Sequence, residues 1–169
     1  MTKTAPQKIF LKDYEPPAYQ ILSVQMDFVI APDADNKNDI CLVTTKSYFK
    51  QIKPVSELFL NGEDLKLVSF TVNGKPASYT TNTEGLTLQN PPAEFELTVV
   101  TEHQPHLNTS LEGLYQSNGI FCTQCEAQGF RKITYFLDRP DVMTTFQVRI
   151  EADKKKYPIL LSNGNRAES

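Results

Sequence analysis

The run Leu22-Ser-Val-Gln-Met-Asp-Phe-Val-Ile30 decides the fold class, because its side chains alternate strictly in polarity. Apolar side chains occupy the even positions of this run, and Ser23, Gln25 and Asp27 hold three of the odd ones. Successive side chains of a β-strand point to opposite faces, so a period of two indicates a strand with one face in a core and the other in water. The sequence therefore predicts a half-buried strand over residues 22–30.

Further β-rich runs follow this strand towards the C-terminus. They cover residues 40–45, 58–60, 65–72, 86–88, 95–99, 144–152 and 157–161. A turn cluster at residues 33–38 makes the run at 40–45 the expected hairpin partner of the first strand. Because short strands recur at intervals of about 10 to 20 residues without a sustained helical period, the pattern favours an all-β fold of antiparallel sheets.

Two Asn-Gly steps, Asn61-Gly62 and Asn73-Gly74, each follow an apolar run. Both residue types tolerate the positive φ that two-residue hairpin turns require, so we expect a hairpin at each step. A third turn signal at residues 162–165 has no second arm before the sequence ends at Ser169. This last turn suggests that the sequence is a piece of a longer chain.

Length, charge and hydropathy limit the possible classes. A chain of 169 residues can bury roughly 70% of its unfolded surface, so we expect one domain over residues 1–169, with residues 1–13 as a flexible arm. The formal charge of −3 disfavours nucleic acid as a partner. No apolar run approaches the roughly 20 residues that cross a bilayer, and residues 1–8 lack the apolar core of a signal peptide, so we expect a cytoplasmic protein without a membrane partner.

The three cysteines, Cys41, Cys122 and Cys125, fit a reducing compartment, because an odd number does not build a disulfide framework. Cys122-x-x-Cys125 has the spacing of half a zinc ribbon or of a redox pair, and His103 and His106 are further candidate ligands. A proline between the two histidines disfavours a metal-binding helix, and no βαβ pattern flanks the cysteines. A zinc-ribbon or thiol-dependent role is thus the less favoured interpretation, and we expect Cys122 and Cys125 to be free thiols.

Residues 107–141 concentrate reactive side chains with little strand or helix periodicity, which is typical of an irregular binding segment carried on a scaffold. Within it, Gln124 and Glu126 lie two positions apart, which in an extended segment places both on one side. An amide oxygen and a carboxylate together suit a primary ammonium group, which offers three donors. The same pair also fits two ordinary exposed loop residues. No His-Glu-x-x-His or Gly-x-Ser-x-Gly motif is present, so no catalytic residue is predicted.

Two longer runs contain this pair and the residues after it: Cys122-Thr-Gln-Cys-Glu-Ala-Gln-Gly-Phe-Arg131 and Ile133-Thr-Tyr-Phe-Leu-Asp-Arg-Pro-Asp-Val142. With residues 60–68, 108–117 and 157–166, they resemble the N-terminal domain of bacterial aminopeptidase N, a zinc metallopeptidase of the gluzincin class. The resemblance covers residues 14 to 166 and is dense from Leu107 onward. It implies a bent, saddle-like and sandwich-like all-β domain that precedes a thermolysin-like catalytic domain and further helical domains, all absent from this chain.

The resemblance also implies roles for individual residues. In the family, zinc and the general-base glutamate belong to the catalytic domain, so zinc would be the cofactor of the full-length enzyme and would not be bound by this chain. The family's Gln-Cys-Glu segment corresponds to Gln124 and Glu126, which would hold the free amino terminus of a peptide substrate. The implied partners are this peptide N-terminus and the catalytic domain of the same polypeptide, and the chain would be inactive alone. The alternative is a free-standing β-sandwich module that binds a protein or glycan through residues 107–141.

Overall fold

The fold was determined from a computed structural model, which describes residues 10–30 and 40–167. These residues contain strands and short 3-10 helices and no α-helix, which confirms the all-β class. The strands are β1 (Tyr19–Ile30), β2 (Cys41–Gln51), β3 (Glu57–Asn61), β4 (Lys66–Val72), β5 (Lys75–Pro76), β6 (Tyr79–Asn82), β7 (Gly85–Gln89), β8 (Glu94–His103), β9 (Gly113–Ser117), β10 (Ile120–Gln124) and β11 (Thr145–Glu151). The 3-10 helices are η1 (Leu11–Asp13), η2 (Pro105–Leu107) and η3 (Phe130–Lys132).

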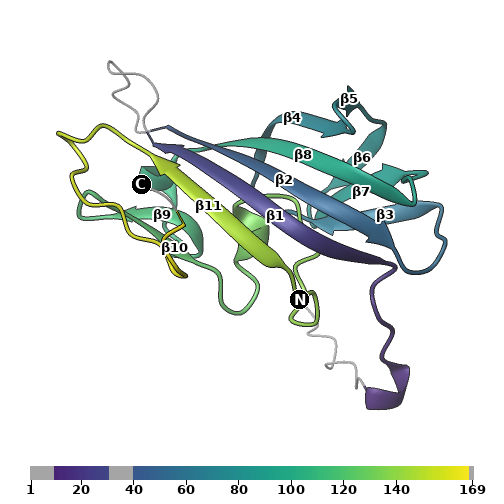
Figure 1. Cartoon of the computed structure of the whole chain (residues 1–169). Helices are drawn as coiled ribbons and strands as arrows, with labels where there is room; N and C mark the ends of the chain where they lie inside the picture. Colours follow the sequence, from purple (N-terminus) through teal and green to yellow (C-terminus); the bar gives the residue numbers. More distant parts are fainter. Residues whose placement is uncertain (1–9, 31–39, 168–169) are drawn as a thin grey trace.

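Three sheets make up the described part of the chain. The largest has the strand order β11-β1-β2-β8-β4-β5, and the two smaller sheets have the orders β3-β7-β6 and β9-β10. Figure 1 shows the long strands of the large sheet running diagonally side by side, with the β9–β10 hairpin and η3 beneath them. The three-stranded sheet lies towards the other end of the same view. The β9–β10 hairpin thus lies beneath the large sheet in this view.

One strand pair departs from the expected antiparallel arrangement. β11 runs parallel to β1, with Phe146 opposite Val24 and Val148 opposite Met26. The other strand pairs found among the described residues are antiparallel. No hairpin forces a direction on strands that lie far apart in sequence, so polarity patterning located β11 but could not give its direction.

The first strand is longer than predicted and contains a β-bulge. The pairing of β1 with β2 shifts between Ile21 and Ser23. Tyr19 and Ile21 are buried before the shift and Val24 after it, whereas Leu22 is 39% exposed. An extra residue in one strand reverses the alternation of faces, so the prediction that Leu22 points into the core was wrong. The predicted pairing of this strand with residues 40–45 is confirmed, and the turn cluster at 33–38 lies outside the described residues.

Only one of the two Asn-Gly steps closes a hairpin. Asn73 and Gly74 have φ values of +50° and +72° and join β4 to β5, as predicted. The prediction at Asn61-Gly62 was wrong, because β3 pairs with β7 and β4 pairs with β8. Asn61 instead forms an isolated bridge with Phe136, which ties β3 to the segment after η3.

An aromatic cluster fixes one end of the large sheet. The rings of Phe49 and Phe95 stack with their centroids 4.9 Å apart, and Tyr19 meets them edge-on at 6.2 and 5.7 Å. The Tyr19 hydroxyl donates to the carbonyl oxygen of Pro92 at 2.9 Å and accepts from the Gln51 side chain at 2.9 Å. A buried tyrosine needs such partners for its hydroxyl, and here they join β1, β2 and the start of β8.

The C-terminal part of the described chain differs from its prediction. Residues 157–161 form no strand, and Ile159 and Leu161 are exposed. A proline at 158 offers no N–H to a neighbouring strand, and this segment pairs with none. At the N-terminal end, residues 1–9 of the predicted arm lie outside the described residues, and Leu11–Asp13 form the exposed helix η1. No helix in the described ranges is long and apolar enough to cross a bilayer.

Candidate functional site

The segment predicted to be irregular contains a regular β-hairpin. β9 and β10 are joined by Asn118 and Gly119, whose φ values of +49° and +82° suit a two-residue turn. Gln124 ends β10 and lies opposite Gly113. The Asn-Gly step between two short β-rich runs was the sequence signal that could have revealed this hairpin. Gln124 is therefore held on a strand, and only the residues after it form a turn.

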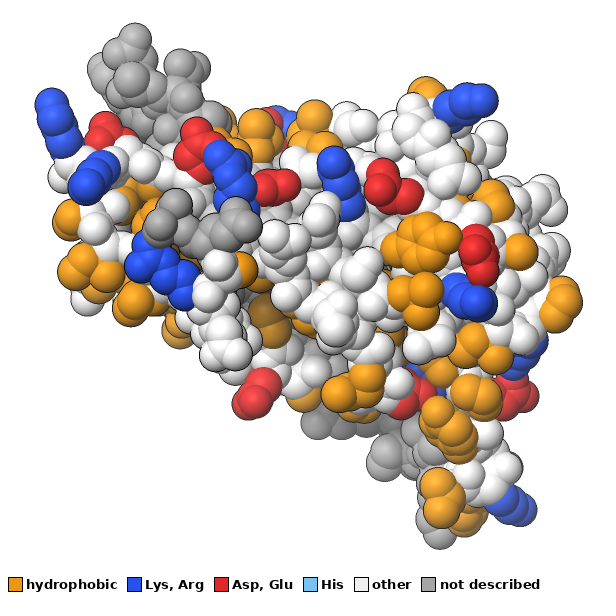
Figure 2. Space-filling model, viewed as in Figure 1, with side chains coloured by type: hydrophobic (Ala, Val, Ile, Leu, Met, Phe, Trp, Pro, Cys, Tyr) orange, Lys and Arg blue, Asp and Glu red, His pale blue; other side chains and the backbone are white. Residues whose placement is uncertain are grey.

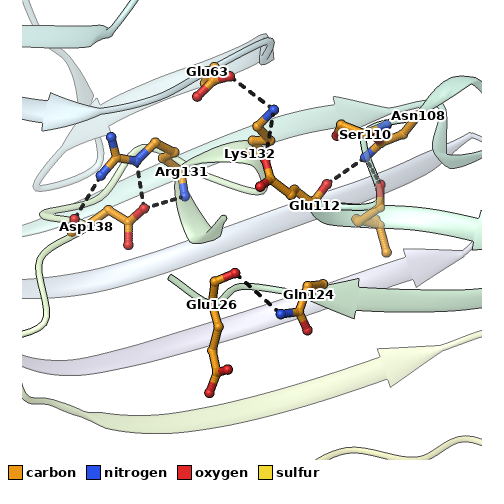
Figure 3. Close-up of polar contacts among 10 residues, drawn as sticks. Glu63, Asn108, Ser110, Glu112, Gln124, Glu126, Arg131, Lys132 and Asp138 are labelled. Carbon is orange, nitrogen blue, oxygen red and sulfur yellow. Dashed lines mark hydrogen bonds and ion pairs between the residues drawn. The ribbon is translucent and has the colours of Figure 1, made fainter. Parts of the chain in front are cut away.

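Gln124 and Glu126 lie together at the end of this hairpin. The Gln124 Nε2 atom donates a hydrogen bond to the Glu126 carbonyl oxygen at 3.4 Å, and both residues are exposed. Glu126 lies in a turn instead of the predicted extended segment, and the Gly129 N–H closes this turn on the Cys125 carbonyl oxygen at 2.9 Å. Figure 3 shows the Glu126 carboxylate extending away from the neighbouring ion pairs, while the Gln124 side-chain nitrogen points to the Glu126 backbone oxygen.

Neighbouring acids are already paired, in contrast to Glu126. Asp138 binds Arg131, and Glu63 and Glu112 lie 3.0 and 3.4 Å from the Lys132 ammonium. Within residues 10–30 and 40–167, the Glu126 carboxylate has neither an ion pair nor a hydrogen bond. Glu126 is thus an acceptor that remains available for a cationic ligand.

A nearly buried ion pair fastens the helix that follows the turn. The Arg131 Nε atom donates to the Asp138 Oδ2 atom at 2.8 Å, the Arg131 backbone N–H donates to the same oxygen at 3.2 Å, and Arg131 Nη2 donates to the Asp138 carbonyl oxygen at 3.0 Å (Figure 3). The two side chains are 18% and 11% exposed. Several donors on one carboxylate fix both position and orientation, so η3 has a defined place beneath the sheet.

His103 has a structural role in the same region. Its Nε2 atom lies 2.8 Å from the Thr101 hydroxyl and 3.0 Å from the Ile133 carbonyl oxygen, and Thr101 also donates to that carbonyl at 2.8 Å. A carbonyl can only accept, so the Nε2 atom carries the proton. Burial lowers the pKa of His103, which favours this neutral form. His103 therefore joins β8 to the segment after η3.

The described cysteines and histidines do not gather into a group that could hold a metal ion. Cys122 and Cys125 are free thiols, as predicted. Burial, with a smaller effect from the Asp138 charge, raises the pKa of Cys125, so its reactive thiolate is disfavoured. In the part of the chain that the structure describes, no three His, Cys, Asp or Glu side chains gather to hold a metal ion. Within residues 10–30 and 40–167, no group of side chains therefore offers zinc a site.

A separate polar cleft of about 420 Å³ lies near the ends of β4 and β8. Four of its charged side chains form two ion pairs, Lys66 with Glu102 at 2.6 Å and Lys132 with Glu63 at 3.0 Å, whereas Asp64 has no ion pair among the described residues.

Most of the chain is similar in sequence to known proteins. Residues 15–169 match the family described as Peptidase M1 N-terminal domain. The chain is 46% identical over 162 residues to aminopeptidase N of Escherichia coli (strain K12), a match that covers 95% of this chain and 18% of that protein. It is 43% identical over 173 residues to aminopeptidase N of Caulobacter vibrioides, covering 100% of this chain and 19% of the relative. The chain thus spans less than a fifth of the length of these relatives.

Solved structures show the same architecture. The crystal structure of Legionella pneumophila aminopeptidase A in complex with aspartic acid gives a TM-score of 0.78 at 27% identity, over 94% of this chain and 19% of that one. The crystal structure of an M1 zinc metallopeptidase from Deinococcus radiodurans gives a TM-score of 0.64 at 14% identity, over 79% of this chain and 32% of that one. It therefore shares the fold. Because the family match extends over residues 15–169, including the whole framework that carries Gln124 and Glu126, the chain belongs to the Peptidase M1 N-terminal domain family.

Proposed function

We propose that this chain is the substrate-anchoring domain of a zinc-dependent aminopeptidase that removes N-terminal amino acids from peptides. Gln124 and Glu126 receive the free α-amino group of the substrate. The observation that carries this proposal is an exposed carboxylate, without a partner in the described residues, beside an amide whose NH₂ group already donates to Glu126. The Gln124 side-chain oxygen is thereby left to accept.

The chemistry of the pair matches an ammonium ion. A peptide N-terminus offers three N–H donors and a positive charge, and charge-assisted hydrogen bonds to a carboxylate are among the stronger kinds. Anchoring the amino group fixes the distance to the first peptide bond, so only the terminal residue is presented for cleavage. In the full-length enzyme, where the catalytic domain would enclose these acceptors, a blocked or internal amine would leave them unpaired, at a cost of about 1–3 kcal/mol for each group.

The catalytic groups would come from the rest of the polypeptide. No metal cluster occurs in the described part of this chain, so we assign zinc to the catalytic domain and no step of the reaction to this domain. Apolar side chains beside the site support a contact with such a domain, because Phe146 and Val148 on β11 are 52% and 39% exposed. Figure 2 shows further apolar side chains gathered at the left end of the molecule, where the segment after β11 lies. A cytoplasmic location stays a prediction.

The proposal is tested in the full-length enzyme. Glu126→Ala should raise KM and lower kcat for aminoacyl substrates, with kcat/KM falling roughly ten- to a hundred-fold, because a charged acceptor is lost. Glu126→Gln separates charge from shape, and it should lose most of the same activity. Glu84→Ala, in the exposed turn before β7, serves as a control that should leave kcat/KM unchanged. Wild-type kinetics in Glu126→Ala would contradict the anchoring role.

A further inference from the structure

Gly129 occupies a position where its backbone conformation does not require glycine. Its φ of −87° and ψ of −8° are open to any L-residue. A Cβ atom added there would lie 2.5 Å from the Gln124 carbonyl oxygen and 3.1 Å from the Cys125 Cα atom. Both neighbours are backbone atoms and cannot rotate away as a side-chain tip could. The absence of a side chain is therefore needed for a close approach between two stretches of backbone.

The peptide that Gly129 approaches is the one that joins the two halves of the proposed anchor. This is the peptide between Gln124 and Cys125, and Glu126 comes directly after Cys125. The Gly129 N–H also donates to the Cys125 carbonyl oxygen at 2.9 Å, which closes the turn that carries Glu126. Any shift of this peptide would change the directions of both anchor side chains.

The elements around this contact are fixed from two further directions. Gly113 lies opposite Gln124 in the hairpin, and a Cβ atom on it would lie 2.6 Å from the Lys132 Cβ atom. Gly129 is followed by η3, which the Arg131–Asp138 contacts hold in place. The end of β10 is therefore enclosed between the start of η3 and the preceding strand.

We propose that Gly129 is a positioning residue for amine binding. By bringing the Gln124–Cys125 peptide against the start of η3, it sets the relative directions of Gln124 and Glu126. This inference rests on the proposed function, because it requires these two side chains to bind the substrate amine. Gly129 itself contacts no substrate and acts through the other two residues.

The same hairpin provides a matched control at its other end. Gly119 has a φ of +82°, and a Cβ atom on it would meet no atom within 4 Å. Gly119→Ala therefore strains the turn between β9 and β10 without touching the anchor peptide. Comparing the two glycine variants separates a general loss of hairpin stability from displacement of the anchor.

The test is a double-mutant cycle in the full-length enzyme, with Gly129→Ala, Glu126→Ala and their combination, beside Gly119→Ala. Melting temperature and kcat/KM for an aminoacyl substrate are measured for each variant. We expect Gly129→Ala to lower kcat/KM roughly ten-fold in the wild-type background and by less than about two-fold in the Glu126→Ala background, because the displaced anchor is then already absent. Gly119→Ala should lower the melting temperature while kcat/KM stays within about two-fold of wild type.

The outcomes separate this inference from the proposed function. The inference is overturned if Gly129→Ala lowers kcat/KM by the same factor in the wild-type and Glu126→Ala backgrounds. It is also overturned if Gly129→Ala lowers kcat/KM no more than Gly119→Ala does, because Gly129 would then support the fold alone. If Glu126→Ala itself has no effect, the proposed function fails first. Should Gly129→Ala not fold, Arg131→Lys replaces it in the cycle, because it loosens η3 without adding atoms to the turn. Equal losses of kcat/KM from Arg131→Lys in both backgrounds would then overturn the inference.

Discussion

The side-chain nitrogen of Gln124 donates a hydrogen bond to the main-chain carbonyl oxygen of Glu126, 3.4 Å away. This contact engages the amide group, the only donor group of the glutamine side chain, and leaves its oxygen without a hydrogen bond among the described residues. Gln124 is therefore suited to accept a hydrogen bond from a substrate, and its amide nitrogen is as important as its oxygen.

A Gln124→Glu variant of the full-length enzyme tests this orientation. If charge alone attracted the substrate amine, a second carboxylate would strengthen binding. We expect the opposite, with kcat/KM falling roughly five- to thirty-fold, because the new oxygen faces the Glu126 carbonyl without a proton to share, which costs about 1–2 kcal/mol. Gln128→Glu adds the same charge to the same turn and should leave kcat/KM near wild type. Higher kcat/KM in Gln124→Glu would show that the hydrogen bond does not matter.

The Arg131–Asp138 pair should contribute strongly to stability. Asp138→Ala leaves a largely buried guanidinium without its carboxylate, and we expect a loss of about 3 kcal/mol in the free energy of unfolding, measured by urea denaturation of this chain. Glu15→Ala is the matched control, because its partner Lys53 is 47% exposed, Glu15 itself is 80% exposed, and such pairs contribute less than about 1 kcal/mol. Equal losses in the two variants would argue against a special role for Arg131 and Asp138.

His103 should make stability depend on pH. Burial places its pKa in the folded state below the ordinary value of 6.5, so the unfolded state binds the proton more readily. Its contribution is therefore complete above about pH 6.5 and decreases as the pH falls from there towards the folded-state pKa. We expect a lower melting temperature at about pH 5 than at about pH 7.5.

The contribution of His103 to this pH dependence is isolated with the variant His103→Gln. The side-chain amide of the glutamine can still donate towards the Ile133 carbonyl oxygen. This variant has no group that titrates at position 103, so its melting temperature should change less between the two pH values. An unchanged pH dependence would assign the effect to other groups.

Polarity patterns revealed the strands of this chain but not how they pair. The alternation after Leu22 located β1, and the bulge that exposes Leu22 left no local signal. The two Asn-Gly steps look equivalent in sequence, yet the Tyr135 ring would lie 2.3 Å from a Cβ atom added to Gly62, which is packed inside the fold and not at a hairpin tip. Contacts with residues more than 70 positions away decide this difference.

The candidate site was identified from residue types, while its geometry depends on distant contacts. An amide and an acid two positions apart suggested an amine ligand, and the family resemblance pointed to the same pair. The relative position of the two residues depends on Gly129 and on the attachment of η3 to β8 through His103 and the Ile133 carbonyl oxygen, 30 positions apart. No local sequence pattern indicates such contacts, so Gly129 and His103 were not identified from the sequence as residues that position the site.

The parallel pairing of β11 with β1 has a consequence for the order of folding. Gln25 and Gln147 meet across these strands although 122 positions separate them, and β1 pairs with β2 on its other side. During synthesis, β1 and β2 can associate as soon as both have left the ribosome, but the outer edge of β1 stays open until β11 has been made. Closing so long a loop is entropically costly and slow, so β1 should leave the ribosome before the other described strands of its sheet and yet be among the last to acquire its second neighbour.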